Sequence, residues 1–164
     1  MNIFYLNRDP KIAAEMHCDK HVVKMILESA QMLSTAHRVL DGDTLADAAC
    51  LYKLAFKNHP CSVWVRANNS NYKWLFDLYE SLMTEYTYRY DKHHASERLI
   101  IALRTVPTNI TQGAFTDPPM CMPDHCKIDD PMLSYQNYYM VEKSYFAKWK
   151  RRPVPDWFTT ASSR

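Results

Sequence analysis

Apolar residues recur at three- and four-residue spacing along much of the chain, which is the period of an amphipathic helix. The segments that this pattern predicts as helices are 11–40, 44–57, 61–90, 96–104 and 133–150. The first of them is either continuous or restarted at Asp19, and the third is either continuous or broken near 68–71. On the first helix the apolar side carries Val22, Ile26 and Leu33, so this side is expected to face the core.

Residues that favour turns mark the boundaries between these helices. Asp9-Pro10 is typical of a helix start, because aspartate caps a helix and proline fits its first turn. Residues 106–132 contain five prolines and predict a long irregular loop, a feature that is often functional in a compact domain. A short extended segment at 2–6 precedes the first helix, and a tail at 151–164 follows the last one. We predict one all-α domain, a helical bundle that spans the whole chain.

Composition narrows the functional classes. The chain has 164 residues, with 20 Lys and Arg against 18 Asp and Glu, so its formal net charge is +2. This balance excludes a protein that coats nucleic acid through bulk positive charge, and any such surface must be a local patch. Only Gly42 and Gly113 are glycines, which excludes glycine-rich phosphate loops and disfavours an all-β fold.

The cysteines and the apolar segments indicate the cellular compartment in which the protein is expected. Five cysteines are an odd number, and no secretory signal pattern precedes them. Reduced thiols in the cytoplasm are therefore expected, in the host cytoplasm if the protein is viral. No stretch is long and apolar enough to predict a membrane span.

A polar stripe runs along the first long helix. At 100° per residue, Lys20, Lys24, Glu28 and Gln31 lie on one side of the helix, and His17 and His21 flank them. An amine and a carboxylate one turn apart can support acid–base or imine chemistry. The same spacing also occurs on any solvated helix face, where a Lys–Glu pair contributes only tenths of a kcal/mol.

The stripe also carries a resemblance to a known family. The residues involved are Asp19-Lys20-His21, Glu28 and Gln31, with Asn2-Ile3-x-x-Leu6 before them and His59-Pro60-x-x-x-Trp64 after them. Together they are similar to a broad set of phage and bacterial proteins, which resembles the pyrimidine dimer DNA glycosylases of the phage endonuclease V type more remotely. In that family an Asp-x-His is followed, seven residues after the histidine, by a catalytic glutamate, the register of Asp19, His21 and Glu28 here.

The resemblance implies an all-helical enzyme that binds damaged duplex DNA and flips a nucleotide out of the stack. It implies that an N-terminal α-amine attacks the deoxyribose C1′ to form a Schiff base, that the glutamate assists sugar opening and proton transfer, and that strand cleavage follows by β-elimination. It implies neither a metal nor another cofactor. An α-amine with a pKa of about 7.7–8.0 is partly neutral at pH 7, as a nucleophile requires.

Two departures from the family pattern affect this expectation. The family exposes a small residue once Met1 is removed, whereas Asn2 follows here, so the amine nucleophile is expected at Met1, Lys20 or Lys24. Leu27 and Gln31 stand where the glycosylases carry helix-face arginines for phosphates.

Residues elsewhere extend the candidate site. Basic residues near the C-terminus alternate with aromatic ones, a combination that suits phosphates and unstacked bases but also a solvated amphipathic helix. The residues expected to contact substrate are Asp19, His21, Gln31, His59, Arg66, Asn71, Lys148, Lys150 and Arg151.

Two other functions are open from the residues. His17 and His21 are four residues apart, a spacing seen in metal sites, and could join Cys18, His59 or the Cys121–His125–Cys126 group. A His-ligated, metal-dependent hydrolase is therefore one alternative, although no Cys-x-x-Cys or His-Glu-x-x-His element is present and no metal is predicted. The other is a non-catalytic binder of nucleic acid or a small nucleotide. We expect a monomer.

Overall fold

The computed structural model describes residues 2–159, which form helices joined by loops with no β-strand among them. The α-helices are α1 (Pro10–Met16), α2 (Asp19–Asp41), α3 (Asp43–Ala48), α4 (Pro60–Val65), α5 (Asn69–Tyr90), α6 (Ile100–Arg104) and α7 (Pro131–Tyr138). Short 3₁₀ turns at Ala95–Leu99 and Asp124–Cys126 and a π-helical turn at Tyr139–Lys143 complete the elements. The expected all-α class is confirmed.

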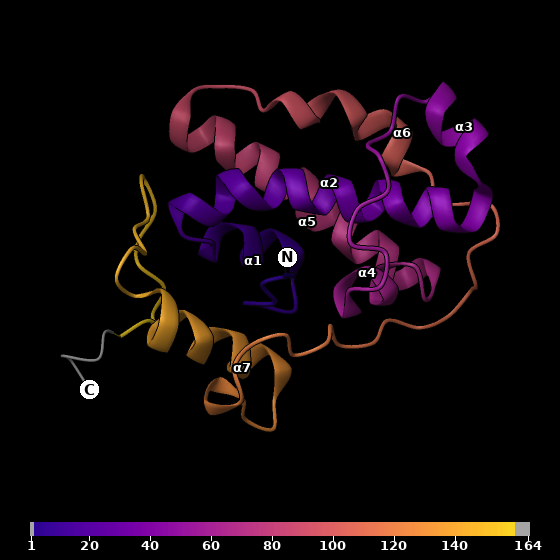
Figure 1. Ribbon diagram of the computed structural model, residues 1–164. Helices are drawn as coiled ribbons and strands as arrows, with labels where there is room; N and C mark the ends of the chain where they lie inside the picture. The colour runs from indigo at the N-terminus through magenta and orange to yellow at the C-terminus, as the bar shows by residue number, and fades with distance from the viewer. Residues whose placement is uncertain (1, 160–164) are drawn as a thin grey trace.

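The two longest helices, α2 and α5, lie side by side and form the centre of the molecule (Figure 1). The apolar side predicted for 11–40 is buried, since Val22, Ile26 and Leu33 are fully enclosed. From α5, Tyr72 and Tyr79 enter the same core. Burial of each large apolar side chain contributes roughly 1.5–3 kcal/mol, so this pair of faces holds the bundle together.

The structure shows whether the predicted helices over 11–40 and 61–90 are continuous or broken, and both are broken. The first stretch restarts at Asp19, because the chain turns extended at His17 and Cys18. The third breaks between Val65 and Asn69, and the Asn68 side chain caps α5 by accepting a hydrogen bond from the Asn71 amide at 2.8 Å.

The N-terminal segment is extended, as expected, and it is buried rather than peripheral. Ile3 to Leu6 are at most 5% exposed, and the segment lies between α1 and α7 (Figure 1). The Gln136 side chain donates to the Leu6 carbonyl at 3.0 Å, and Trp74 donates to the Arg8 carbonyl at 2.9 Å. Hydrogen bonds of this kind satisfy an extended backbone that has no sheet partner.

The helix predicted over 44–57 is wrong beyond residue 48. After α3 the chain extends along α2, and side chains of α2 take up its backbone groups. The Tyr52 carbonyl accepts from Arg38 at 2.7 Å, and Thr35 Oγ1 is hydrogen-bonded to both the amide and the carbonyl of Ala55, at 3.1 and 3.2 Å. Cys50 has a φ of 57°, which ends helical geometry there.

The helix predicted over 133–150 is also too long. Regular α-helix ends at Tyr138, and a π-helical turn carries it to Lys143. The next residues leave the helix because their backbone binds α2: the Lys148 carbonyl accepts from the Asp19 amide at 2.7 Å. The chain then reverses at Arg151, whose φ is 60°.

The long irregular loop is confirmed over 106–130, apart from a 3₁₀ turn, whereas residues 131 and 132 already belong to α7; the loop follows the surface of the bundle from α6 to α7 (Figure 1). Asp41 accepts from the amides of Thr108 and Asn109 at 2.7 and 3.0 Å, and Asn71 accepts from the Thr116 amide at 3.0 Å. The loop is therefore fastened to α2 and α5 along its length.

Candidate active site

Glu28 is half-buried on α2, which packs against α4. Its charge acts on His59, the residue that caps α4: burial lowers the pKa of His59, and the Glu28 carboxylate opposes this shift. His59 Nδ1 accepts a hydrogen bond from the Cys61 amide at 3.1 Å, and Pro60 occupies the first turn. The motif His59-Pro60 thus works as a helix start that holds an imidazole near the glutamate.

The beginning of the chain reaches the same place. The Ile3 backbone is hydrogen-bonded to the Cys61 side chain. The Cys61 and Cys121 sulfurs lie 3.7 Å apart, which brings the long loop to this point as well. Met1, a predicted nucleophile, lies outside the described residues. The described chain therefore brings Glu28, His59 and the first residues of the N-terminal segment together.

The lysines of the predicted stripe are on the surface. Lys20 and Lys24 are exposed, and Lys20 Nζ lies 4.8 Å from the centre of the Phe146 ring. Lys24 precedes Glu28 by one turn, so the two side chains share one side of α2. Gln31 is half-buried one turn further on, and Leu27, in the place of a family arginine, is 40% exposed.

His21 is buried and holds the N-terminal segment against α2. Its ring stacks on Phe4 with the centroids 4.1 Å apart, and its Nδ1 is hydrogen-bonded to the Tyr139 hydroxyl at 2.6 Å. Burial, together with nearby positive charge, lowers the pKa of His21 to about 2, so the ring is neutral. His17 is equally buried, and burial lowers its pKa to about 4. Among the described residues, His17, Cys18 and His21 do not form a cluster that could hold a metal ion.

The two buried histidines make stability depend on pH. Below about pH 6.5 the unfolded chain binds protons that the folded His17 and His21 reject, so stability falls as the pH drops. Each histidine costs about 1.4 kcal/mol per pH unit in this window. We expect urea unfolding to show a clear loss between pH 6.5 and 5.5, and a smaller loss in His17→Gln. Equal stability at both pH values would contradict the burial of neutral rings.

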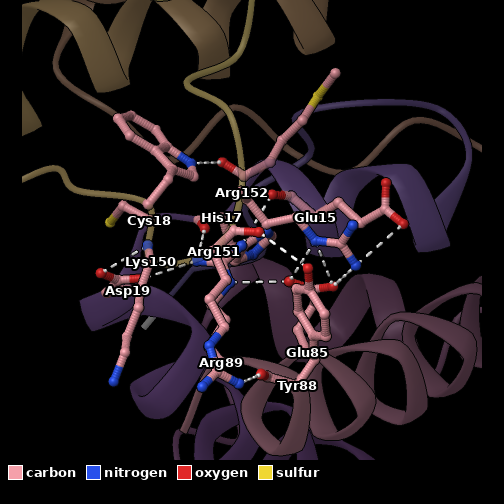
Figure 2. Close-up of polar contacts among 12 residues, drawn as sticks. Glu15, His17, Cys18, Asp19, Glu85, Tyr88, Arg89, Lys150, Arg151 and Arg152 are labelled. Carbon is pink, nitrogen blue, oxygen red and sulfur yellow. Dashed lines mark hydrogen bonds and ion pairs between the residues drawn. The ribbon is translucent and has the colours of Figure 1, made fainter.

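Asp19 belongs to a buried ionic network at the N-terminal end of α2 (Figure 2). Arg89, fully buried on α5, donates to Asp19 at 3.0 Å, to Glu85 at 2.9 Å and to the carbonyls of Glu15 and His17 at 2.9 and 2.8 Å. Arg89 thus ties α5 to α1, to α2 and to the turn between them. Asp19 thereby joins the first turn of α2, the helix that carries Glu28, to α5.

The C-terminal basic segment packs against this network. The Lys150 amide donates to the Asp19 carboxylate at 2.9 Å, and Lys150 Nζ lies 5.0 Å from the Tyr90 ring centre. Arg151 donates to the Tyr88 carbonyl at 2.9 Å and pairs with Asp91 at 3.3 Å. Lys148 is exposed. The structure therefore places the basic residues of both chain regions, 20–24 and 148–151, around one end of α2.

Two predicted contact residues are engaged inside the fold. Asn71 is fully buried and donates to the Trp64 carbonyl at 3.0 Å, besides holding Thr116. Arg66 donates to the Lys57 carbonyl at 2.7 Å, and its Nη1 is buried with no hydrogen-bond partner in the described chain. Both residues fix the turns around α4, which lies beside Glu28.

Some residues of this region could not be predicted from the sequence. Tyr139, fully buried, contacts both His21 and the Cys18 amide, and Cys121 approaches Cys61 from a distant loop. Residues far apart in sequence give no local signal of such contacts. The charged residue Arg89 on an apolar helix was the one available hint, because a buried arginine needs carboxylate partners.

One cavity, with a volume of about 770 Å³, does not have Glu28 in its lining. It lies against α5 and is lined by glutamates that are already paired, such as Glu80 with Arg104 and Glu85 with Arg152. None of the predicted site residues lines it. The region around Glu28 is thus distinct from this cavity. Among residues 2–159, no helix is long and apolar enough to cross a membrane.

Comparison with known proteins identifies the class. A family model described as pyrimidine dimer DNA glycosylase matches residues 1–98, which include α1, α2, α3, α4 and α5. No curated protein and no solved structure matches the chain. The chain belongs to the pyrimidine dimer DNA glycosylase family, so DNA is its substrate class and glycosylase activity is the implied reaction.

Proposed function

We propose that this protein is a DNA glycosylase and AP lyase that acts on damaged or modified bases in duplex DNA. One observation carries the proposal: Glu28 stands at the family's register behind Asp19 and His21, and it lies where the start of the chain and the start of α4 meet. Imine chemistry needs an amine as nucleophile and a group that moves protons, and the Glu28 carboxylate would supply the second of these.

The reaction follows from these groups. A neutral amine attacks C1′ of the damaged nucleotide, the bond from C1′ to the base nitrogen breaks, and the base leaves with a proton. Glu28 transfers protons as the sugar ring opens and the imine forms between the amine and C1′. Removal of a proton from C2′ then breaks the C3′–O bond, which cuts the strand, and water hydrolyses the imine to free the amine. Every step therefore uses only the amine, Glu28, the DNA and water.

Three amines are candidates for the nucleophile, at Met1, Lys24 and Lys20. The α-amine of Met1 is favoured, because Met1 precedes Ile3 by two residues in the sequence. The Ile3 backbone contacts Cys61 near Glu28. Its pKa of about 7.7–8.0 in an unperturbed chain leaves a neutral fraction at pH 7. Lys24 is the second choice because it shares one side of α2 with Glu28.

The other predicted residues position the chemistry or the DNA. His21 fixes Phe4 and thereby the start of the chain, while Asp19 fixes the end of α2 through Arg89. Lys148, Lys150 and Arg151, with Lys20 and Gln31, supply the face on which phosphates of damaged duplex DNA would lie. Tyr145, 85% exposed beside this segment, offers an aromatic surface for an unstacked base. We propose an intracellular monomer.

The test is an incision assay on a labelled duplex with one thymine dimer or one abasic site, in the presence of a metal chelator. We expect nicking at the lesion and none on the undamaged duplex. Saturable binding of both duplexes without any nicking would contradict the enzyme and favour the non-catalytic binder.

A further inference from the structure

His59, Cys61 and Cys121 form a cluster beside Glu28, and none of the three carries a step of the proposed reaction. A ligand atom from each side chain lies within 4.8 Å of those of the other two. We propose that these three residues bind one Zn²⁺ ion, which fastens the long loop to the start of α4. This inference does not depend on the proposed function and differs from the absence of metal expected from the sequence.

The distance between the two sulfurs fits this ion. The Cys61 and Cys121 sulfurs are 3.7 Å apart. Two thiolates that bind Zn²⁺ at about 2.3 Å with tetrahedral geometry are separated by roughly 3.8 Å. The thiol pair therefore needs almost no movement to accept the ion, whereas a disulfide would require the sulfurs to approach to about 2.05 Å.

The backbone on both sides of the cluster is held in place. Cys61 is in the first turn of α4, behind the His59 cap and Pro60. Cys121 is held by the fully buried Tyr135, whose hydroxyl accepts from the Cys121 amide at 3.2 Å and donates to the Pro119 carbonyl at 2.5 Å. Partners of this kind behind the ligands orient a metal site.

The His59 ring brings one of its nitrogens into the cluster. His59 Nδ1 accepts from the Cys61 amide, so the ring carries its proton on the other nitrogen when it is neutral. An ion at Nδ1 would replace that hydrogen bond. His59 and Cys121 are half-buried, which gives the ion a route from solvent.

The ligand set indicates zinc. Two thiolates and one imidazole favour a soft or borderline divalent ion over Mg²⁺ or Ca²⁺, which prefer oxygen ligands. Three protein ligands leave a fourth position for water. A second cluster, of His125, Cys126 and Glu142, is less suited, because the exposed His125 is already paired with Glu142 at 2.5 Å. It supplies a matched control.

The experiment measures metal binding by the full chain, purified under reducing conditions and stripped with chelator. After addition of ZnCl₂ and desalting, we expect about one zinc per chain, and Co²⁺ should give the intense absorption of thiolate ligation. Cys121→Ser and Cys61→Ser are expected to lower zinc affinity more than roughly 100-fold. Cys126→Ser and the exposed Cys50→Ser should retain it. The half-buried Cys121 is the better variant if replacement of the buried Cys61 prevents folding.

Three results would overturn the site. The first is less than a tenth of an equivalent of zinc in the reduced wild-type chain. The second is zinc binding that survives Cys121→Ser but is lost in Cys126→Ser. The third is a Cys61–Cys121 disulfide that forms at once in air even with zinc present. None of these results measures incision of DNA. The zinc site and the proposed function are therefore tested independently of each other.

Discussion

Replacement of Glu28 by glutamine is expected to lower incision of damaged duplex DNA by about 10²–10⁴-fold, the contribution typical of a positioned acid or base. Glutamine keeps the size of the side chain but cannot transfer a proton. DNA affinity should change little, because the phosphate contacts that we propose are made by the basic residues around the N-terminal end of α2. The measurement is a single-turnover incision assay together with a binding titration at fixed salt.

The matched control is Glu80→Gln on α5. Glu80 is a surface glutamate paired with Arg104 at 2.7 Å, and it lines a cavity whose lining does not include Glu28, so its replacement removes one negative charge outside the candidate site. We expect full incision by this variant. Full incision by Glu28→Gln as well would remove Glu28 from the mechanism.

Replacement of Arg89 by methionine is expected to produce the largest loss of stability, about 3–5 kcal/mol. Methionine fills the volume but leaves the buried Glu85 with one partner fewer and the Glu15 and His17 carbonyls without their donor. For a domain of this size the midpoint of thermal unfolding should fall by on the order of 10 °C. Calorimetry or thermal circular dichroism measures this shift.

Arg104→Met is the comparison for that experiment. Its ion pair with Glu80 is half exposed, and exposed pairs contribute at most about 1 kcal/mol. We expect a shift of no more than a few degrees. If the two arginine variants unfolded at the same temperature, the buried network would not be what joins α1, α2 and α5.

Much of the fold follows from local sequence signals. The spacing of Val22, Ile26 and Leu33 defines the buried side of α2, and Asp9-Pro10 and Asn68 mark helix starts that the structure has. The signals fail where tertiary contacts outweigh local preference. Residues 49–57 are extended because Arg38 and Thr35 of α2 bind their backbone, and no pattern within the segment reveals those partners.

The candidate site was predictable to a similar degree. The register of Asp19, His21 and Glu28 on one helix could be read from spacing and family resemblance, and the family match bears out the resemblance. The burial of His21 against Phe4 and Tyr139 could not be predicted from the sequence. Tyr139 is more than a hundred positions away from His21, so no local pattern reveals the contact. Spacing places side chains on a helix, whereas the neighbouring helices decide which of them reach solvent.

The most direct test of the proposed chemistry is borohydride trapping on a duplex that carries one abasic site. Borohydride reduces an imine to a stable amine, so the protein stays bonded to the DNA only if the Schiff base forms. We expect a one-to-one adduct, with the modified peptide at Met1 or, as the second choice, at Lys24. Incision of the duplex without any trapped adduct, or an adduct on a lysine distant from Glu28, would contradict amine catalysis at this site.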